Sequence, residues 1–237
     1  MTRLPVSDRE WVRLHIDTLF THDAQGRIVH VNDRSARPAP RFYLARTASG
    51  CEWRFRNDQD DKLVTAIDAV CRAEPWREAA MDAPIDASKL EAPLNASAPI
   101  QRRWAGPIFR FPQELTLASD THIITAANAQ LLERHFTDWL DDVPQCQPFL
   151  AVVQAGHAVS LCASVRRSEA AHQAGVETTD AFRGRGYAAH VTAAWAHAVR
   201  GSGCCCPLYS TSWENAASRA LAARLKLILF GADLHFT

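Results

Sequence analysis

Residues 183–188 have the residue types and spacing best suited to chemistry in this chain, in the order Arg183-Gly184-Arg185-Gly186-Tyr187-Ala188. A β-like run at 175–179 precedes them, and an alanine-rich run of helical character follows at 187–200. The first backbone N–H groups of a helix lack internal partners, and glycine lets a ligand approach the backbone closely. Arginine adds charge-assisted hydrogen bonds to phosphate oxygens. The pattern therefore predicts that a phosphate-bearing ligand binds at this turn.

The surrounding residues narrow the class of ligand. A P-loop needs Gly-Lys followed by Ser or Thr, whereas Gly186 is followed by Tyr187 and Ala188. A dinucleotide-binding fold needs an acidic residue about 20 positions further on, whereas residues 181–213 contain no Asp or Glu. An acid-free turn that carries arginines suits a pyrophosphate or a ribose 3′-phosphate. These features together indicate coenzyme A.

The run 175–188 resembles the acyl-coenzyme-A-binding motif of the GCN5-related N-acetyltransferase (GNAT) superfamily. That motif reads Q/R-x-x-G-x-G/A and follows a strand that ends in an aromatic residue. Its defined positions are filled here by Arg183, Gly186 and Ala188, and the aromatic position is filled by Phe182.

A second block is similar to the fifth strand and fourth helix of the same family. It comprises the run 207–212 and a helix opened by Asn215, with Ser218 one turn in. The resemblance is specific over 173–237, is weaker over 100–172, and does not extend by motif to 1–99. It implies an α/β (α+β) fold with a mixed, mostly antiparallel sheet, splayed central strands and flanking helices.

The resemblance also implies an activity and a set of binding residues. The activity is transfer of an acetyl group from acetyl-coenzyme A to a primary amine by direct attack, with no metal. Val176 and Thr178 are expected to bind the pantetheine arm, and the backbone N–H groups of the turn are expected to bind the pyrophosphate. The other expected coenzyme-A-binding residues are Arg183, Gly184, Arg185, Gly186, Tyr187, Ala188, Asn215 and Ser218. Purely structural roles stay open, because Asn215 is also a good helix cap and a glycine at 184 is also what the turn alone would need.

Glu177 is the first candidate for the general base, because it alternates with the two expected pantetheine-binding residues on the strand nearest the thioester. Glu177 could equally be an ordinary exposed glutamate of a strand. His172 and Glu214 are weaker candidates for the general base. Many family members place a tyrosine as general acid seven residues after the helix-opening asparagine, and that position is Ala222 here. Tyr209 or water is left to protonate the thiolate.

Composition limits the other possibilities. The chain has 237 residues, 47% hydrophobic residues and a formal net charge of zero, so we expect neither nucleic acid nor a membrane as a partner. The start of the sequence has no apolar signal core, and the seven cysteines lack a CxxC pair. Free thiols in the cytoplasm are therefore expected. Neither a metal role nor acyl-enzyme catalysis is favoured for Cys204-Cys205-Cys206.

The pattern of elements predicts two parts. Residues 1–99 form an N-terminal α/β segment, with a capped helix after Ser7, strands within 26–32 and 41–56, a helix at 60–73 and a Pro/Ala-rich connector. This segment is a candidate degenerate half of the same fold. Residues 100–237 are the expected acetyltransferase domain, in which strands are expected at 107–111, 148–154, 157–166, 173–179, 207–212 and between 227 and 236, with helices at 126–140, 187–200 and 216–227. A hairpin turn at Ala155-Gly156 is expected to join the strands 148–154 and 157–166.

Two functions are compared at this stage. The leading one is an N-acetyltransferase that acts on a small amine, which Asp138, Asp141 and Asp142 could attract, although a solvated helix end is the more ordinary role for them. A homodimer is the default expectation for such enzymes. The alternative is a non-catalytic module that binds acyl-coenzyme A or a partner, which the missing tyrosine motivates.

Overall fold

The computed structural model describes residues 5–75, 80–116, 120–203 and 205–237. They divide into two compact units. The turn unit comprises residues 110–209 and 217–228, and the N-terminal unit comprises the described residues up to 109 together with 210–216 and 229–237. Cys204 and the first four residues lie outside the described residues. The predicted division at residue 99 stays a prediction.

Local sequence signals fix the helices of the N-terminal unit. Helix α1 (Asp8–Leu19) begins at the predicted capping box, in which Ser7 and Glu10 satisfy each other's backbone N–H groups. Helix α2 (Asp61–Ala73) begins where the Asp60 side chain accepts a hydrogen bond from the Leu63 N–H. Helix α3 (Ser88–Ser97) lies within the stretch expected to be a connector, and it buries Leu90 and Leu94.

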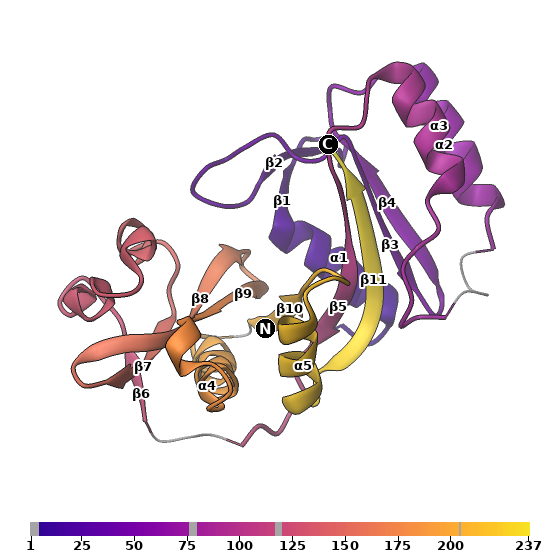
Figure 1. Cartoon of the computed structure of the whole chain (residues 1–237). Coiled ribbons are helices and arrows are strands. Elements are labelled where there is room, and N and C mark those ends of the chain that lie inside the picture. Colours follow the sequence, from indigo (N-terminus) through magenta and orange to yellow (C-terminus); the bar gives the residue numbers. More distant parts are fainter. Residues whose placement is uncertain (1–4, 76–79, 117–119, 204) are drawn as a thin grey trace. The chain divides into compact units, whose positions relative to one another are not determined.

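The strands of this unit come from both ends of the chain. They are β3 (Phe42–Thr47), β4 (Gly50–Phe55), β5 (Arg103–Arg110) and β11 (Ile228–Phe236), in the order β4-β3-β11-β5. Strand β3 is antiparallel to both β4 and β11. Strands β1 (Phe20–His22) and β2 (Ile28–Val31) form a separate antiparallel pair. The α2–α3 pair covers one face of the main strands, and its apolar side chains form a buried core with them (Figure 1).

The turn unit has five strands in the order β10-β9-β8-β7-β6. They are β6 (Thr121–Ile123), β7 (Phe149–Gln154), β8 (His157–Arg167), β9 (Ala171–Thr178) and β10 (Cys206–Ser210). Only the β9–β10 pair is parallel. The remaining elements are the 3₁₀ segments η1 (Ala129–Leu132), η2 (Thr137–Asp142) and η3 (Asp180–Phe182) and helices α4 (Tyr187–Gly201) and α5 (Ala216–Arg224).

The predicted hairpin at residues 155–156 is confirmed. Ala155 and Gly156 have φ values of 48° and 80°, as a tight turn between right-twisted strands requires. The predicted helix at 126–140 is wrong, because two 3₁₀ segments replace it. The cause is local: the Asn128 side chain accepts from the Thr125 N–H and donates to the Ile123 carbonyl, so it competes with helical hydrogen bonding.

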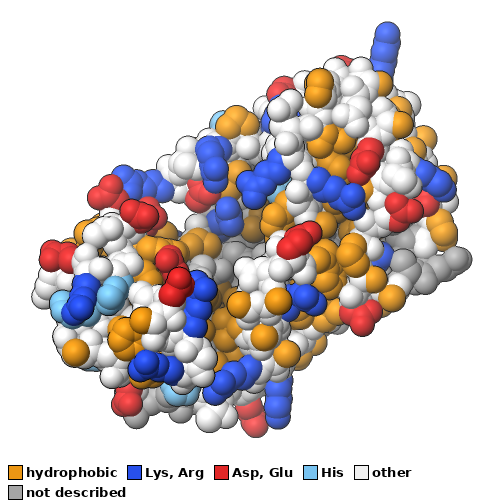
Figure 2. Space-filling view, viewed as in Figure 1, with side chains coloured by type: hydrophobic (Ala, Val, Ile, Leu, Met, Phe, Trp, Pro, Cys, Tyr) orange, Lys and Arg blue, Asp and Glu red, His pale blue; other side chains and the backbone are white. Residues whose placement is uncertain are grey.

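The predicted fold class is confirmed by these elements, since the chain is mixed α/β with mostly antiparallel strands flanked by helices. The surface agrees with the zero net charge, because positive and negative side chains are interspersed over the visible face (Figure 2). No helix in the described ranges has the length and apolar character needed to cross a membrane.

Candidate functional site

The turn at 183–188 owes its shape to two glycines. Strand β9 ends at Thr178, and η3 follows, closed by hydrogen bonds from the Phe182 and Arg183 N–H groups to residues 179 and 180. Gly184 and Gly186 then take φ values of 75° and 86°, a left-handed conformation that side-chain-bearing residues rarely adopt. Gly186 is also the N-cap of α4 and offers no capping side chain. The sequence therefore directs the chain sharply from strand to helix.

This geometry leaves backbone donors without partners. Within the described ranges, the N–H groups of residues 184–189 make no hydrogen bond to the chain. Helix α4 has no acidic residue in its first turn, so no side chain of that turn offsets the positive end of the helix dipole. Such a set of convergent donors is suited to an anion with several oxygens.

The two arginines of the turn are held by local contacts. The Arg183 Nη2 atom lies 2.8 Å from Asp180 Oδ1, and both side chains are exposed. Asp180 lies directly before the acid-free run 181–213, so Arg183 has an acidic neighbour that this run does not include. Arg185 donates to the Ala181 carbonyl at 3.2 Å, and its guanidinium lies 4.8 Å from the Phe182 ring centroid. Both cations are therefore positioned along the turn before any ligand arrives.

A third arginine, which the sequence did not predict, lies against the turn. A Cβ atom placed on Gly186 would be 2.9 Å from Nη2 of Arg224, at the end of α5. No described residue forms a hydrogen bond or an ion pair with the Arg224 guanidinium. Residues 186 and 224 are far apart in sequence, so only the fold brings this cation to the donor-rich turn. It adds an uncompensated positive charge there.

The strands next to the turn separate as the fold class predicts. The β9–β10 register joins Ala171–Gln173 to Cys206–Leu208. Within the described residues, 174–178 have register partners on β8 but none on β10. Val176 and Thr178 lie in this open stretch, and the Thr178 hydroxyl is 2.7 Å from that of Ser160. Backbone groups on the β10 side of β9 are thus available to an extended ligand.

Glu177 is exposed and has a defined orientation. Its Oε2 accepts a 2.6 Å hydrogen bond from the indole N–H of Trp139, in η2. The Trp139 ring is fixed in turn by an edge contact with Phe149 and by close approach to Gly175. The carboxylate therefore lies on the face of β9 that η2 covers, and one of its oxygens remains open to other partners.

Tyr209 and Ser218 lie together in the turn unit. Their hydroxyl groups are hydrogen-bonded, and the Tyr209 side chain is buried. Burial raises the pKa of Tyr209 to about 12, although the hydrogen bond with Ser218 opposes this. A phenol with so high a pKa stays protonated near neutral pH and is a weak proton donor. Ala222, at the position of the family's tyrosine, is buried one helical turn beyond Ser218.

The weaker candidates for the general base, His172 and Glu214, lie outside the open stretch 174–178 of β9. His172 is buried and hydrogen-bonds through Nδ1 to the Ser164 hydroxyl, which also accepts from the Trp195 indole. Burial, with a smaller effect of Arg167, lowers the pKa of His172 to about 4. Glu214 and Asn215 belong to the N-terminal unit, and the Asn215 N–H donates to the Ser212 carbonyl. Their expected roles stay predictions.

The acidic residues of η2 and the cysteines have ordinary surroundings. Asp138 and Asp141 are exposed, and Asp142 is partly buried. Cys206 is buried, and the Cys205 thiol donates to the Glu169 carbonyl. No group of three or more potential ligands able to hold a metal ion occurs among the residues outside the gaps.

Comparison with known proteins finds structural likeness only. No protein-family profile matches the chain, and no curated protein matches its sequence. Among solved structures, the chain is similar to a GCN5-related N-acetyltransferase from Kribbella flavida, with 14% identity, a TM-score of 0.49 and coverage of 99% of this chain and 96% of that one. A GCN5-related N-acetyltransferase-like protein from Streptococcus suis gives 15% identity, a TM-score of 0.49 and coverage of 84% and 85%.

A GNAT-family structure from Novosphingobium aromaticivorans gives 15% identity and a TM-score of 0.47. That match covers 58% of this chain and 65% of the other, which is just under two thirds of its length. Solved structures similar to this chain thus include several GNAT proteins, as the motif resemblance predicted.

Proposed function

We propose that the protein transfers an acetyl group from acetyl-coenzyme A to the primary amine of a small molecule. The observation that supports this most is the turn at 183–188, where unpartnered backbone donors meet the open edge of β9. The donors suit a pyrophosphate, and the open edge of β9 suits the amide groups of a pantetheine arm. Arg224 adds a cation beside Gly186.

The proposed binding follows from these positions. Residues 184–188 would hold the pyrophosphate through N–H groups, with Arg183 and Arg185 at the rim. Backbone groups of Val176 and Thr178 would bind the pantetheine. Ser218 would add to this site, although it is already hydrogen-bonded to Tyr209, and the expected role of Asn215 stays a prediction.

The chemistry needs one proton removed from an ammonium group and one returned to a thiolate. Glu177 would accept the first proton, because its carboxylate is exposed, oriented by Trp139 and adjacent to the open stretch of β9. The amine nitrogen then forms a bond to the thioester carbonyl carbon, the C–S bond breaks, and the nitrogen gives its second proton to water as the amide forms. Tyr209 would serve the leaving sulfur as a hydrogen-bond donor, and water would supply the proton, because a phenol with a pKa of about 12 is too weak an acid.

A second candidate function is binding of acyl-coenzyme A without turnover. It is favoured by Ala222, which is buried in place of the family's tyrosine. Thiol release separates the two candidates: the protein is incubated with acetyl-coenzyme A and a panel of amines, and free thiol is followed with a chromogenic disulfide. Coenzyme A binding without thiol release on any amine would support the binding module.

Substitution of two arginines of α5 tests the proposed coenzyme A site. Arg224→Gln removes the cation beside Gly186 and should weaken coenzyme A binding about tenfold, the usual effect of one charge-assisted hydrogen bond. Arg219→Gln removes an exposed arginine elsewhere on α5 and is the matched control. Equal affinities for both variants and the wild type, by titration calorimetry, would contradict the proposed site.

A cytoplasmic location, a small amine as acceptor and a homodimer are parts of the same proposal. The six described cysteines are free thiols, which agrees with a reducing compartment. Native mass spectrometry of the full chain tests the dimer.

A further inference from the structure

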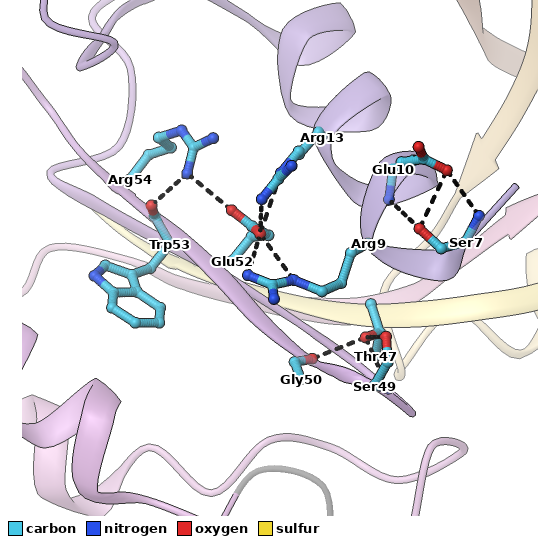
Figure 3. Close-up of polar contacts among 10 residues, drawn as sticks. All are labelled: Ser7, Arg9, Glu10, Arg13, Thr47, Ser49, Gly50, Glu52, Trp53 and Arg54. Carbon is cyan, nitrogen blue, oxygen red and sulfur yellow. Dashed lines mark hydrogen bonds and ion pairs between the residues drawn. The ribbon is translucent and has the colours of Figure 1, made fainter. Parts of the chain in front are cut away.

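Three arginines of the N-terminal unit converge on one carboxylate (Figure 3). Arg9 and Arg13 lie on successive turns of α1, and Arg54 lies on β4 two residues after Glu52, on the same face of the strand. Arg9 donates to Glu52 Oε1 through Nε and Nη2 at 3.0 and 2.6 Å. Arg13 donates to the same oxygen at 3.2 and 2.9 Å, and Arg54 reaches Oε2 at 3.4 Å. These residues are called the arginine cluster below.

The arginine cluster has more positive charge than Glu52 can neutralise. Three guanidinium groups face one carboxylate, which leaves an excess of two positive charges. Glu10 points away in Figure 3 and is bonded to Ser7 and the Val6 N–H. Asp17 lies 3.8 Å from His22 instead. No second carboxylate of the described ranges forms an ion pair with these arginines.

The donors of the cluster are also in excess. Each of the three guanidinium groups makes two hydrogen bonds, those of Arg9 and Arg13 to Glu52 and those of Arg54 to Glu52 and the Trp53 carbonyl. Their remaining N–H groups have no acceptor among the described residues. A purely structural link between α1 and β4 would explain the contacts of Glu52. It would not require both Arg9 and Arg13, because two like charges on successive turns disfavour a helix.

Exposure shows where a ligand could approach. The Glu52 side chain is 9% exposed, whereas those of Arg9 and Arg13 are 44% and 53% exposed. The carboxylate thus lies on the inner side and the cations on the outer side. Burial tends to raise the pKa of Glu52, but hydrogen bonds from Arg13 and Arg9 outweigh this and hold it below its ordinary value. Glu52 therefore stays ionised and orients the guanidinium groups toward solvent.

We propose that the arginine cluster binds a phosphate dianion, either free phosphate or a small phosphate monoester. Two negative charges match the excess charge, and tetrahedral oxygens can bridge guanidinium forks from adjacent helical turns. A monoanionic carboxylate would neutralise only half of the excess. This site lies in the N-terminal unit and does not depend on the function proposed for the turn.

The test is titration calorimetry of the full chain with inorganic phosphate at low ionic strength. Arg13→Gln should weaken phosphate binding at least about tenfold, because one bidentate, charged contact is lost. Arg13→Lys should give an intermediate loss, since it keeps the charge but not the fork. Arg72→Gln, an exposed arginine paired with Asp68 on α2, is the matched control and should leave the affinity unchanged.

The outcomes separate this proposal from the previous one. Arg224→Gln should not alter phosphate binding at the cluster, and Arg13→Gln should not alter coenzyme A binding. If Arg13→Gln does not fold by circular dichroism, Arg54→Gln from the strand serves in its place. Titration with glycerol phosphate then distinguishes a monoester ligand, which binds more tightly than phosphate, from free phosphate. Absence of saturable phosphate binding by the wild type, or equal binding by the arginine variants, overturns the proposal.

Discussion

The turn and the arginine cluster both gather cations, but they do so in different ways. At the turn, donors come mainly from backbone N–H groups of six consecutive residues, and the local arginines are already engaged by Asp180 and Phe182. In the cluster, all donors are side chains, and they are assembled by packing α1 on β4 around Glu52. Backbone sites can be recognised in a short stretch of sequence, whereas side-chain sites require the fold.

This difference predicts that a substitution in one region leaves ligand binding at the other unchanged. The largest effect, on kcat, is expected beside the turn. Glu177→Gln removes the proposed base and should lower kcat about 10²- to 10⁴-fold. Coenzyme A affinity and phosphate binding at the cluster should stay unchanged. Stopped-assay thiol release and calorimetry measure these quantities.

Trp139→Phe is the companion variant, because it keeps an aromatic ring beside Phe149 and removes the N–H that orients Glu177. It should lower kcat by less than Glu177→Gln. Full activity of Glu177→Gln would exclude this residue as base and leave the anion site intact.

Breaking the turn itself should give the next largest effect. Gly186→Val forces a β-branched residue into a left-handed conformation and places a side chain against Arg224. We expect a loss of about 1–3 kcal/mol in unfolding free energy and a marked loss of coenzyme A affinity. Thermal denaturation and calorimetry test both.

Gly184→Ala is the matched control for Gly186→Val. Gly184 has a similar φ, but a Cβ there would meet no atom within 4 Å. The control should show the conformational cost without the contact with Arg224. Equal losses of affinity in both variants would mean that Arg224 contributes nothing at this position.

The arginine cluster is broken most directly at its carboxylate. Glu52→Gln leaves three cations without their common partner and should cost about 1–2 kcal/mol at neutral pH, reduced by the exposure of the arginines. Because the folded-state pKa of Glu52 is lowered, its stabilisation is present above the ordinary glutamate pKa. It is lost as pH falls through the folded value.

Urea denaturation should therefore show a difference between wild type and Glu52→Gln near neutral pH that shrinks on acidification. Arg72→Gln on α2 removes an exposed ion pair with Asp68 and should change stability little. A difference that grows at low pH would contradict the assigned role of Glu52.

The smallest effect is expected at Tyr209. Tyr209→Phe removes a hydroxyl that pairs with Ser218 but is too weak an acid to be the main proton source. Thiol release should fall only about two- to fivefold, the cost of one neutral hydrogen bond. A loss comparable to that of Glu177→Gln would restore Tyr209 as a general acid.

Prediction from the sequence succeeded where the signal is local. The capping box at Ser7, the hairpin at Gly156 and the strand–turn–helix around Gly186 each follow from adjacent residues. It failed where side chains compete with the backbone, as Asn128 does in the expected helix. It could not find Arg224, because that residue reaches the turn only through the packing of α5.

Strand β11 has a consequence for how the chain reaches its native state. It lies between β3 and β5 in the N-terminal unit and pairs with β3 through Phe42–Phe236. During synthesis, residues 5–110 emerge well before residue 236. The edge of β3 that pairs with β11 therefore stays unpaired until the turn unit has been made. The N-terminal unit thus completes its sheet only after the turn unit has been translated, and until then the open edge of β3 is exposed to incorrect strand pairing.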